Sequence, residues 1–215
     1  VGTTFVWTFS ASGAGGLSLS LTATGTDSGS GDPLYTFQLV SVAVAVQVPA
    51  ALVASAVAIP GTVGVGQSFL LTVTVTNTGQ AAALGVAPVA PTISGIGSAS
   101  YLAGPLPVSV GSLAGGASVI FTWTYSGSLA GLASLTTTVT GMDGNGGWGV
   151  SSGPVAGAVT VVPAGTLVSA VSVSALPVSI CQWIRVALTV TNEGGTTANG
   201  VTPGLVNAST ATIEV

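Results

Sequence analysis

Charged residues are scarce in this sequence, and their scarcity excludes several classes of protein. There is no lysine and no histidine, and Arg185 is the only basic residue beside five acidic ones. Nucleic-acid binding needs clustered cations that displace counterions from phosphates, so we expect no nucleic-acid partner. Catalysis by a nucleophile and a base needs residue types that are absent, and the acids lie far apart in the chain. We therefore expect no enzymatic activity and no cofactor.

Cysteine is also scarce, and long helical apolar runs are missing. Cys181 is the only cysteine, so no disulfide can form within one chain. We expect a small buried apolar residue there, with an intermolecular disulfide as the alternative. The mean hydropathy is +0.84, and residues 39–59 are the most apolar window. Pro49 interrupts this window, and its valines alternate with smaller residues as in a strand, so we expect no membrane insertion.

Long internal repeats are the most informative feature of the sequence. Residues 5–9 (FVWTF) reappear as 121–125 (FTWTY), and residues 17–27 return as 133–143, in both cases 116 positions later. An internal period fixes the architecture before any other signal does. Two further matches have a spacing of 115 positions: 71–79 with 186–194, and 85–88 with 200–203.

The repeats predict how the chain is divided. Pro49 and Pro163 occupy matching positions, which gives segments 1–48, 49–163 and 164–215. The first segment aligns with the back of the middle one, and the last segment aligns with its front. We therefore expect one complete module at 49–163 between two half-modules, each of which needs a partner to complete its core.

The local patterns are those of β-strands. Residues 69–76 alternate apolar and threonine side chains, and residues 119–125 place their aromatic side chains on one face. No stretch keeps a helical period, and 32 glycines with 11 prolines punctuate the chain. We predict an all-β protein of tandem immunoglobulin-like sandwiches with a repeat of about 115 residues. Residues 95–116 form the least regular stretch and are expected to be a long loop.

Four stretches of the sequence carry a resemblance to a known group of proteins. They are 65–69 (VGQSF), 72–79 (TVTVTNTG), 85–88 (GVAP) and 113–123. Together they resemble the CARDB-like and related conserved-repeat immunoglobulin-like modules of prokaryotic surface proteins. The resemblance implies an extracellular or cell-surface location and no particular reaction. The second copy departs from it at Cys181, where a glycine is expected.

Three kinds of candidate site remain. The turn-rich loops with Asp27, Asp32, Asp143 and Asn145 offer oxygens to calcium, although aspartate and asparagine also favour such turns for backbone reasons. The aromatic side chains of residues 5–9 and of residues 121–125 form two stripes, which are expected to be core or contact residues. A sugar-stacking platform is the alternative. Asn207 begins an N-glycosylation sequon, so glycan decoration is a further candidate.

The function that we predict is structural. The chain is expected to be a subunit or periodic segment of an extracellular filament, joined head-to-tail to copies of itself by β-strand complementation between half-modules. A fragment of a long continuous adhesin or stalk of tandem repeats is the main alternative, and a carbohydrate-binding module is a minor one. The predicted assembly and core residues are Phe5, Trp7, Phe9, Leu19, Leu21, Ile184, Val186, Leu188 and Val190.

Overall fold

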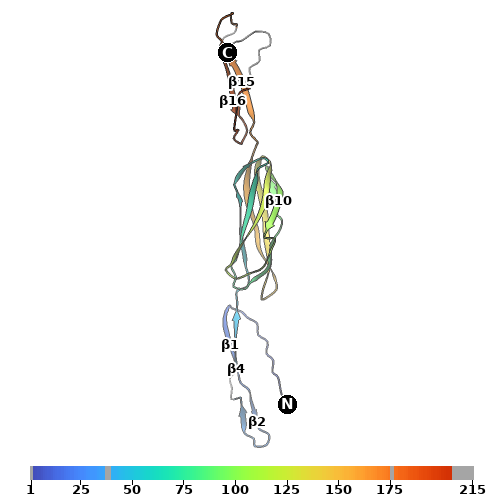
Figure 1. Cartoon of the computed structure of the whole chain (residues 1–215). Helices are drawn as coiled ribbons and strands as arrows, with labels where there is room; N and C mark the ends of the chain where they lie inside the picture. Colours follow the sequence, from blue (N-terminus) through green and yellow to red (C-terminus); the bar gives the residue numbers. More distant parts are fainter. Residues whose placement is uncertain (1, 37–39, 175–176, 205–215) are drawn as a thin grey trace.

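The fold is that of an all-β chain with a central pair of sheets. A computed structural model describes residues 2–36, 40–174 and 177–204. Within these ranges every regular element is a strand and none is a helix, so the all-β prediction is confirmed there. Figure 1 shows that the central sheets lie between two ribbon-like segments, which leave them at opposite ends.

The first central sheet has four antiparallel strands. Its order is β10 (Ser98–Leu106), β12 (Ser118–Leu129), β7 (Ser68–Asn77) and β5 (Leu52–Ile59). The alternation in β7 has the predicted effect, because Leu71, Val73 and Val75 are buried while the threonines between them are partly exposed.

The second central sheet packs against the first. Its order is β11 (Val110–Leu113), β8 (Ala83–Pro88), β13 (Gly131–Asp143), β14 (Gly149–Val162) and β6 (Thr62–Gly64), and β9 (Thr92–Gly95) also pairs with β13. β6 runs parallel to β14, and the other pairings in this sheet are antiparallel.

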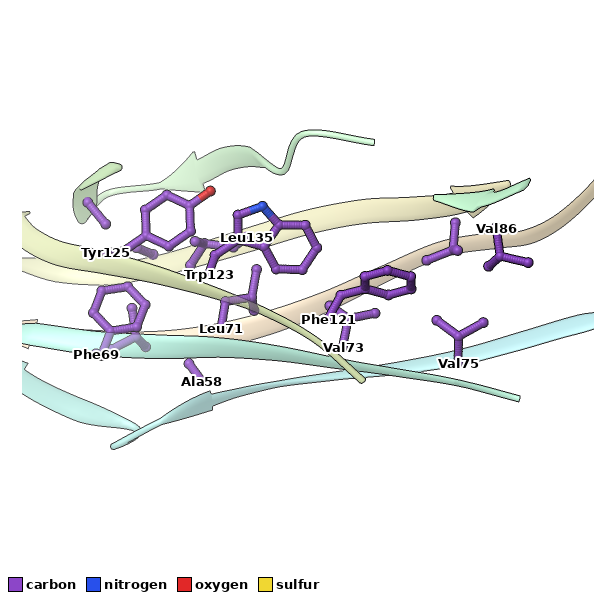
Figure 2. Packing of buried hydrophobic residues seen from close by; sticks show 14 of the residues in the cluster. Ala58, Phe69, Leu71, Val73, Val75, Val86, Phe121, Trp123, Tyr125 and Leu135 are labelled. Atoms are coloured by element: carbon purple, nitrogen blue, oxygen red, sulfur yellow. The ribbon is translucent and has the colours of Figure 1, made fainter. Parts of the chain in front are cut away.

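One hydrophobic core fills the space between the two sheets (Figure 2). Phe121 and Trp123 of β12 and Leu135 of β13 are almost fully buried in it. Phe69 stacks on Tyr125 with ring centroids 5.9 Å apart. The core residues that the structure describes all fall between Ala50 and Val161, so this core belongs to residues 49–163, which we call the central module.

The prediction of a long loop at residues 95–116 is wrong. β10 and β11 lie within this stretch, and β10 pairs with β12. The pairing contains three register shifts, between Ser98 and Leu106. Because a bulged strand disturbs the alternation of its side chains, the stretch carries no clear period in the sequence.

The terminal segments contain shorter strands in two-stranded ribbons. In segment 1–48, β1 (Gly15–Leu21) pairs with β4 (Val40–Val46), and β2 (Thr24–Thr26) pairs with β3 (Pro33–Tyr35). In segment 164–215, β15 (Leu167–Val173) pairs with β16 (Val186–Asn192). Each ribbon has one pairing and no second sheet opposite it among the described residues.

Cys181 corrects a second expectation. The side chain is exposed in this single chain and is not a buried core residue. Its backbone has φ of 69°, close to the 83° of Gly66, which holds the matching position in the central module. The turn at Cys181 therefore keeps the left-handed conformation that glycine adopts most easily.

Candidate assembly surfaces

The hairpin in segment 164–215 repeats one edge of the first central sheet. In the central module, Leu52 pairs with Asn77 and Ile59 with Leu70. The matching pairs 115 positions later begin with Leu167 and Asn192, and the register continues without a shift to the end of β15. This segment thus forms the β5–β7 hairpin again, without β12 beside it.

Segment 1–48 repeats the complementary part of the second central sheet. Gly15 pairs with Val46 as Gly131 pairs with Val161, and this register holds along the whole of β1. The β2–β3 pairing matches the outer end of β13 and β14 in the same way. The two terminal segments therefore contain different strands of the module, and together they contain counterparts of β5, β7, β13 and β14.

The turn after β16 is built like the turn after β7. Asn77 Oδ1 accepts hydrogen bonds from the backbone N–H groups of Ala51 and Gly79, at 3.1 Å in both cases. Asn192 Oδ1 accepts the equivalent bonds from Thr166 at 3.2 Å and Gly194 at 3.1 Å.

Glycine is needed at both of these turns for the same reason. A Cβ at Gly79 would overlap the carbonyl oxygen of Pro49, and a Cβ at Gly194 would overlap that of Ala164. The Asn-x-Gly motif therefore folds each hairpin back against the residues that precede its first strand. It does so whether or not the rest of a module is present.

The terminal segments expose the side chains that the central module buries. Trp7 is 58% exposed, whereas Trp123 at the matching position is 1% exposed. Residues 2–14, which correspond to the whole of β12, contain no strand in this single chain. Leu19 is the one predicted assembly residue that is partly buried, since it packs within the β1–β4 ribbon. The exposed members of the predicted set are Phe5, Trp7, Phe9, Leu21, Ile184, Val186, Leu188 and Val190.

The carboxylate of Asp143 accepts three hydrogen bonds from backbone N–H groups. The backbone N–H of Ala50 donates to Oδ2 at 2.7 Å, and those of Asn145 and Gly146 donate to Oδ1. These donors, with Ala50 contributing most, lower the pKa of Asp143 below its ordinary value of 3.8. The side chain of Asn145 donates to Gln47 Oε1 at 2.9 Å, so it joins segment 1–48 to the central module.

The candidate calcium ligands lie in two separate loops. Asp27 and Asp32 belong to the β2–β3 loop, and Asp143 and Asn145 to the β13–β14 loop. No group of three or more acidic, histidine or cysteine side chains gathers anywhere in the described ranges. Asp27 Oδ1 accepts from Gly29 at 2.9 Å and from Ser30 at 2.8 Å, the hydrogen bonds of an Asx turn.

The aromatic stripe of β12 is core and offers no platform to a sugar. Phe121, Trp123 and Tyr125 are at most 3% exposed. Beside them lies an open hollow of about 500 Å³ with a mostly apolar lining, to which Tyr101 contributes. Its wall in the described chain has no charged side chain; the lining residues are Ala87, Pro88, Ala90, Pro91, Tyr101, Gly104, Pro105, Val108, Ser109, Trp123 and Tyr125.

The described residues bear on the expectation about the membrane but do not include the candidate glycosylation site. Asn207, the candidate glycosylation site, lies outside the described residues. In the parts of the chain that are described, no helix has the length and apolar character needed to cross a membrane.

Comparison of the sequence with protein-family models and with curated proteins gives no match.

Proposed function

We propose that this chain is a structural subunit or periodic segment of an extracellular filament made of tandem immunoglobulin-like sandwiches. Segment 164–215 of one copy would complete segment 1–48 of the next by β-strand complementation, which satisfies open sheet edges with the backbone of a neighbour. The observation that carries the proposal is the register of the β1–β4 and β15–β16 ribbons. Each ribbon repeats the strand pairing of a different part of the central module, and the two parts are complementary.

The central module predicts the register of this contact. There, Phe121 pairs with Val73, Trp123 with Leu71 and Tyr125 with Phe69. The repeat spacing converts these pairs to Phe5 with Leu188, Trp7 with Val186 and Phe9 with Ile184 across the interface. Residues 2–14, which have no strand partner in the single chain, would form a strand beside β16 of the neighbour.

Burial of apolar side chains supplies the driving force. At about 1.5–3 kcal/mol for each large side chain, covering the predicted assembly set is worth on the order of 10 kcal/mol before entropy costs. Apolar area of this extent, left open on a water-exposed surface, is an aggregation liability. The near absence of charge fits such an interface, because few ionised groups would have to be dehydrated on contact.

The placement of the two segments favours a propagating contact. They leave the central sheets at opposite ends (Figure 1), so they do not cover each other within one chain. A head-to-tail contact between different surfaces does not close on itself, and it therefore builds a fibre. Closure of both segments on each other in an isolated monomer would defeat the proposal.

Sedimentation velocity over a dilution series tests the proposal. We expect species that grow in steps of one chain mass, 20.4 kDa, and rods with a regular repeat by electron microscopy. A polypeptide that spans 49–163 is the matched control, because it lacks both interface segments and should stay a monomer. A full chain that remains monomeric at every concentration would contradict self-assembly.

The alternative is that the same pairing occurs inside one continuous adhesin or stalk, where peptide bonds join successive modules. Both arrangements need the same contacts between counterparts of the terminal segments, so the repeat and the register favour neither. The mass of the native material under denaturing conditions separates them. Subunits give a mass near 20.4 kDa, and a continuous chain gives a mass many times larger.

A further inference from the structure

Two hydrogen bonds, one to a side chain and one between backbone groups, hold the end of β13 and the loop after it against the rest of the central module. The N–H of Ala50, just before β5, donates to Asp143 Oδ2 at 2.7 Å. The N–H of Gly144 donates to the carbonyl oxygen of Ala82, just before β8, at 2.8 Å. Asp143 is 1% exposed at this contact, so its charge is satisfied by backbone donors and is shielded from water.

The β2–β3 loop repeats this structure but lacks both bonds. Asp27 N donates to Asp32 O at 2.9 Å, as Asp143 N does to Trp148 O at 2.8 Å. Asp27 Oδ1 also takes two backbone donors in the same pattern as Asp143 Oδ1. In the described part of the chain, no backbone N–H donates to Asp27 Oδ2, and no acceptor meets the N–H of Ser28. The Ser30 hydroxyl also lies close to this carboxylate and, after the two backbone donors, helps to lower its pKa.

The missing donor and acceptor lie in segment 164–215. Gly165 matches Ala50 and Thr197 matches Ala82 in the repeat. Neither the N–H of Gly165 nor the carbonyl oxygen of Thr197 has a hydrogen-bond partner among the described residues. The turn that carries them is already folded, because Asn192 Nδ2 donates to Thr196 O at 2.7 Å as Asn77 Nδ2 does to Ala81 O at 2.8 Å.

We propose that Asp27 and Ser28 form a polar recognition site for a second copy of this chain. The Asp27 carboxylate accepts a hydrogen bond from Gly165 N–H of that copy, and Ser28 N–H donates to its Thr197 carbonyl. This inference rests on the proposed function and extends it. The apolar faces supply most of the affinity, and the two bonds fix the register, since a strand shifted by one residue would leave Asp27 buried without a donor.

The charged groups near this site are all acidic. Asp32 lies in the same loop, and Glu193 occupies the place of Thr78 on the docking hairpin, where its N–H donates to Thr166 O at 2.8 Å. Arg185 lies at the opposite end of β16, beyond the residues that would approach Asp27. The Asp27 carboxylate is therefore held by N–H donors and not by a salt bridge, so a group that cannot accept from Gly165 removes the contact.

The test is the dissociation constant of the assembled full chain at neutral pH, measured by sedimentation for Asp27→Asn. The asparagine keeps Oδ1 for its own turn and replaces Oδ2 with an NH₂ group that cannot accept a hydrogen bond. Loss of a charge-assisted bond at a buried contact should raise the dissociation constant about tenfold or more. Asp32→Asn is the control, because it removes the same charge from the same loop but no predicted contact. It should stay within about twofold of the original chain.

A second pair of variants probes the donor without touching the Asp27 turn. Gly165→Pro removes the N–H, and Gly165→Ala retains it while restoring the residue type found at Ala50. We expect Gly165→Pro to weaken assembly and to add little to Asp27→Asn in the double variant, since both remove one bond. Equal effects of Asp27→Asn and Asp32→Asn, or additive effects of Asp27→Asn and Gly165→Pro, would overturn this inference while leaving the filament proposal intact. Failure of the unmodified chain to assemble would overturn both.

Discussion

Trp7 and Trp123 hold the same position in the repeat but differ in burial. Substitution by alanine is therefore predicted to have a different effect at each position. A tryptophan hides about 150–250 Å² when it is fully buried. Trp7 is 58% exposed and Trp123 only 1% exposed, so completing the module around Trp7 would bury roughly 100 Å² more. At about 25 cal/mol per Å², this area is worth roughly 2–3 kcal/mol.

Trp7→Ala should therefore weaken assembly and leave the central module folded. The expected rise in the dissociation constant is about 30- to 150-fold, measured by sedimentation velocity at several concentrations. The melting transition of the central module, followed by circular dichroism, should not move, because Trp7 is outside its core. Trp123→Ala is the matched comparison, and it should reduce folding stability by about 3–5 kcal/mol.

Two results would refute this reasoning. An unchanged dissociation constant for Trp7→Ala, in a chain that does assemble, would remove residues 5–9 from the interface. A lower melting temperature of the central module in Trp7→Ala would show that segment 1–48 already contributes to that core within one chain. The second result would also contradict the exposure of Trp7 in the structure.

Three further predictions follow from the same features. A polypeptide that spans 49–163 should fold alone into a β-rich monomer, and a random-coil circular dichroism spectrum would contradict this. Trypsin should cut after Arg185 in the dissociated chain, where β16 is exposed, and should not cut in the assembly; equal cleavage in both would show that segment 164–215 does not dock. Because backbone donors lower the pKa of Asp143 below 3.8, its contribution to stability is complete above about pH 4 and is lost as the pH falls further. Urea unfolding of the 49–163 polypeptide between neutral and acidic pH measures this loss, and Asp143→Asn should reduce the dependence.

The sequence alone predicts most of the strands because their faces differ in polarity. The alternation at 69–76 and 119–125 places the buried side chains of β7 and β12 correctly. The prediction fails at 95–116, where register shifts accompany a strand with no clear alternation. A period of two residues is visible only where a strand stays regular.

The polar contacts could not be predicted from local sequence. Asp143 reads as a turn residue, and its second role needs the N–H of Ala50, which is 93 positions away in the chain. The equivalence of Asp27 and Asp143 is visible in the repeat. That Asp27 Oδ2 lacks a backbone donor becomes apparent only once Ala50 is found to donate to the matching oxygen of Asp143. Likewise, the sequence marks Cys181 as a replaced glycine, and only its φ of 69° shows that the turn persists.

An interface that repeats a core faces competition from that core. Segment 1–48 carries the same pattern as β12, so in principle it could pair with β7 of a central module. Within one module, however, β7 and β12 belong to the same chain, with residues 78–117 between them. Closing such a loop within one chain is favoured over capturing a separate molecule, because the cost of closure grows only slowly with loop length. The central module therefore closes first and removes its own β7 from the competition. The exposed β16 of another copy is then the remaining strand with the matching register, and pairing with it depends on concentration. The order of events, folding before assembly, is thus a consequence of the repeat and of the connectivity, and it needs no additional signal in the sequence.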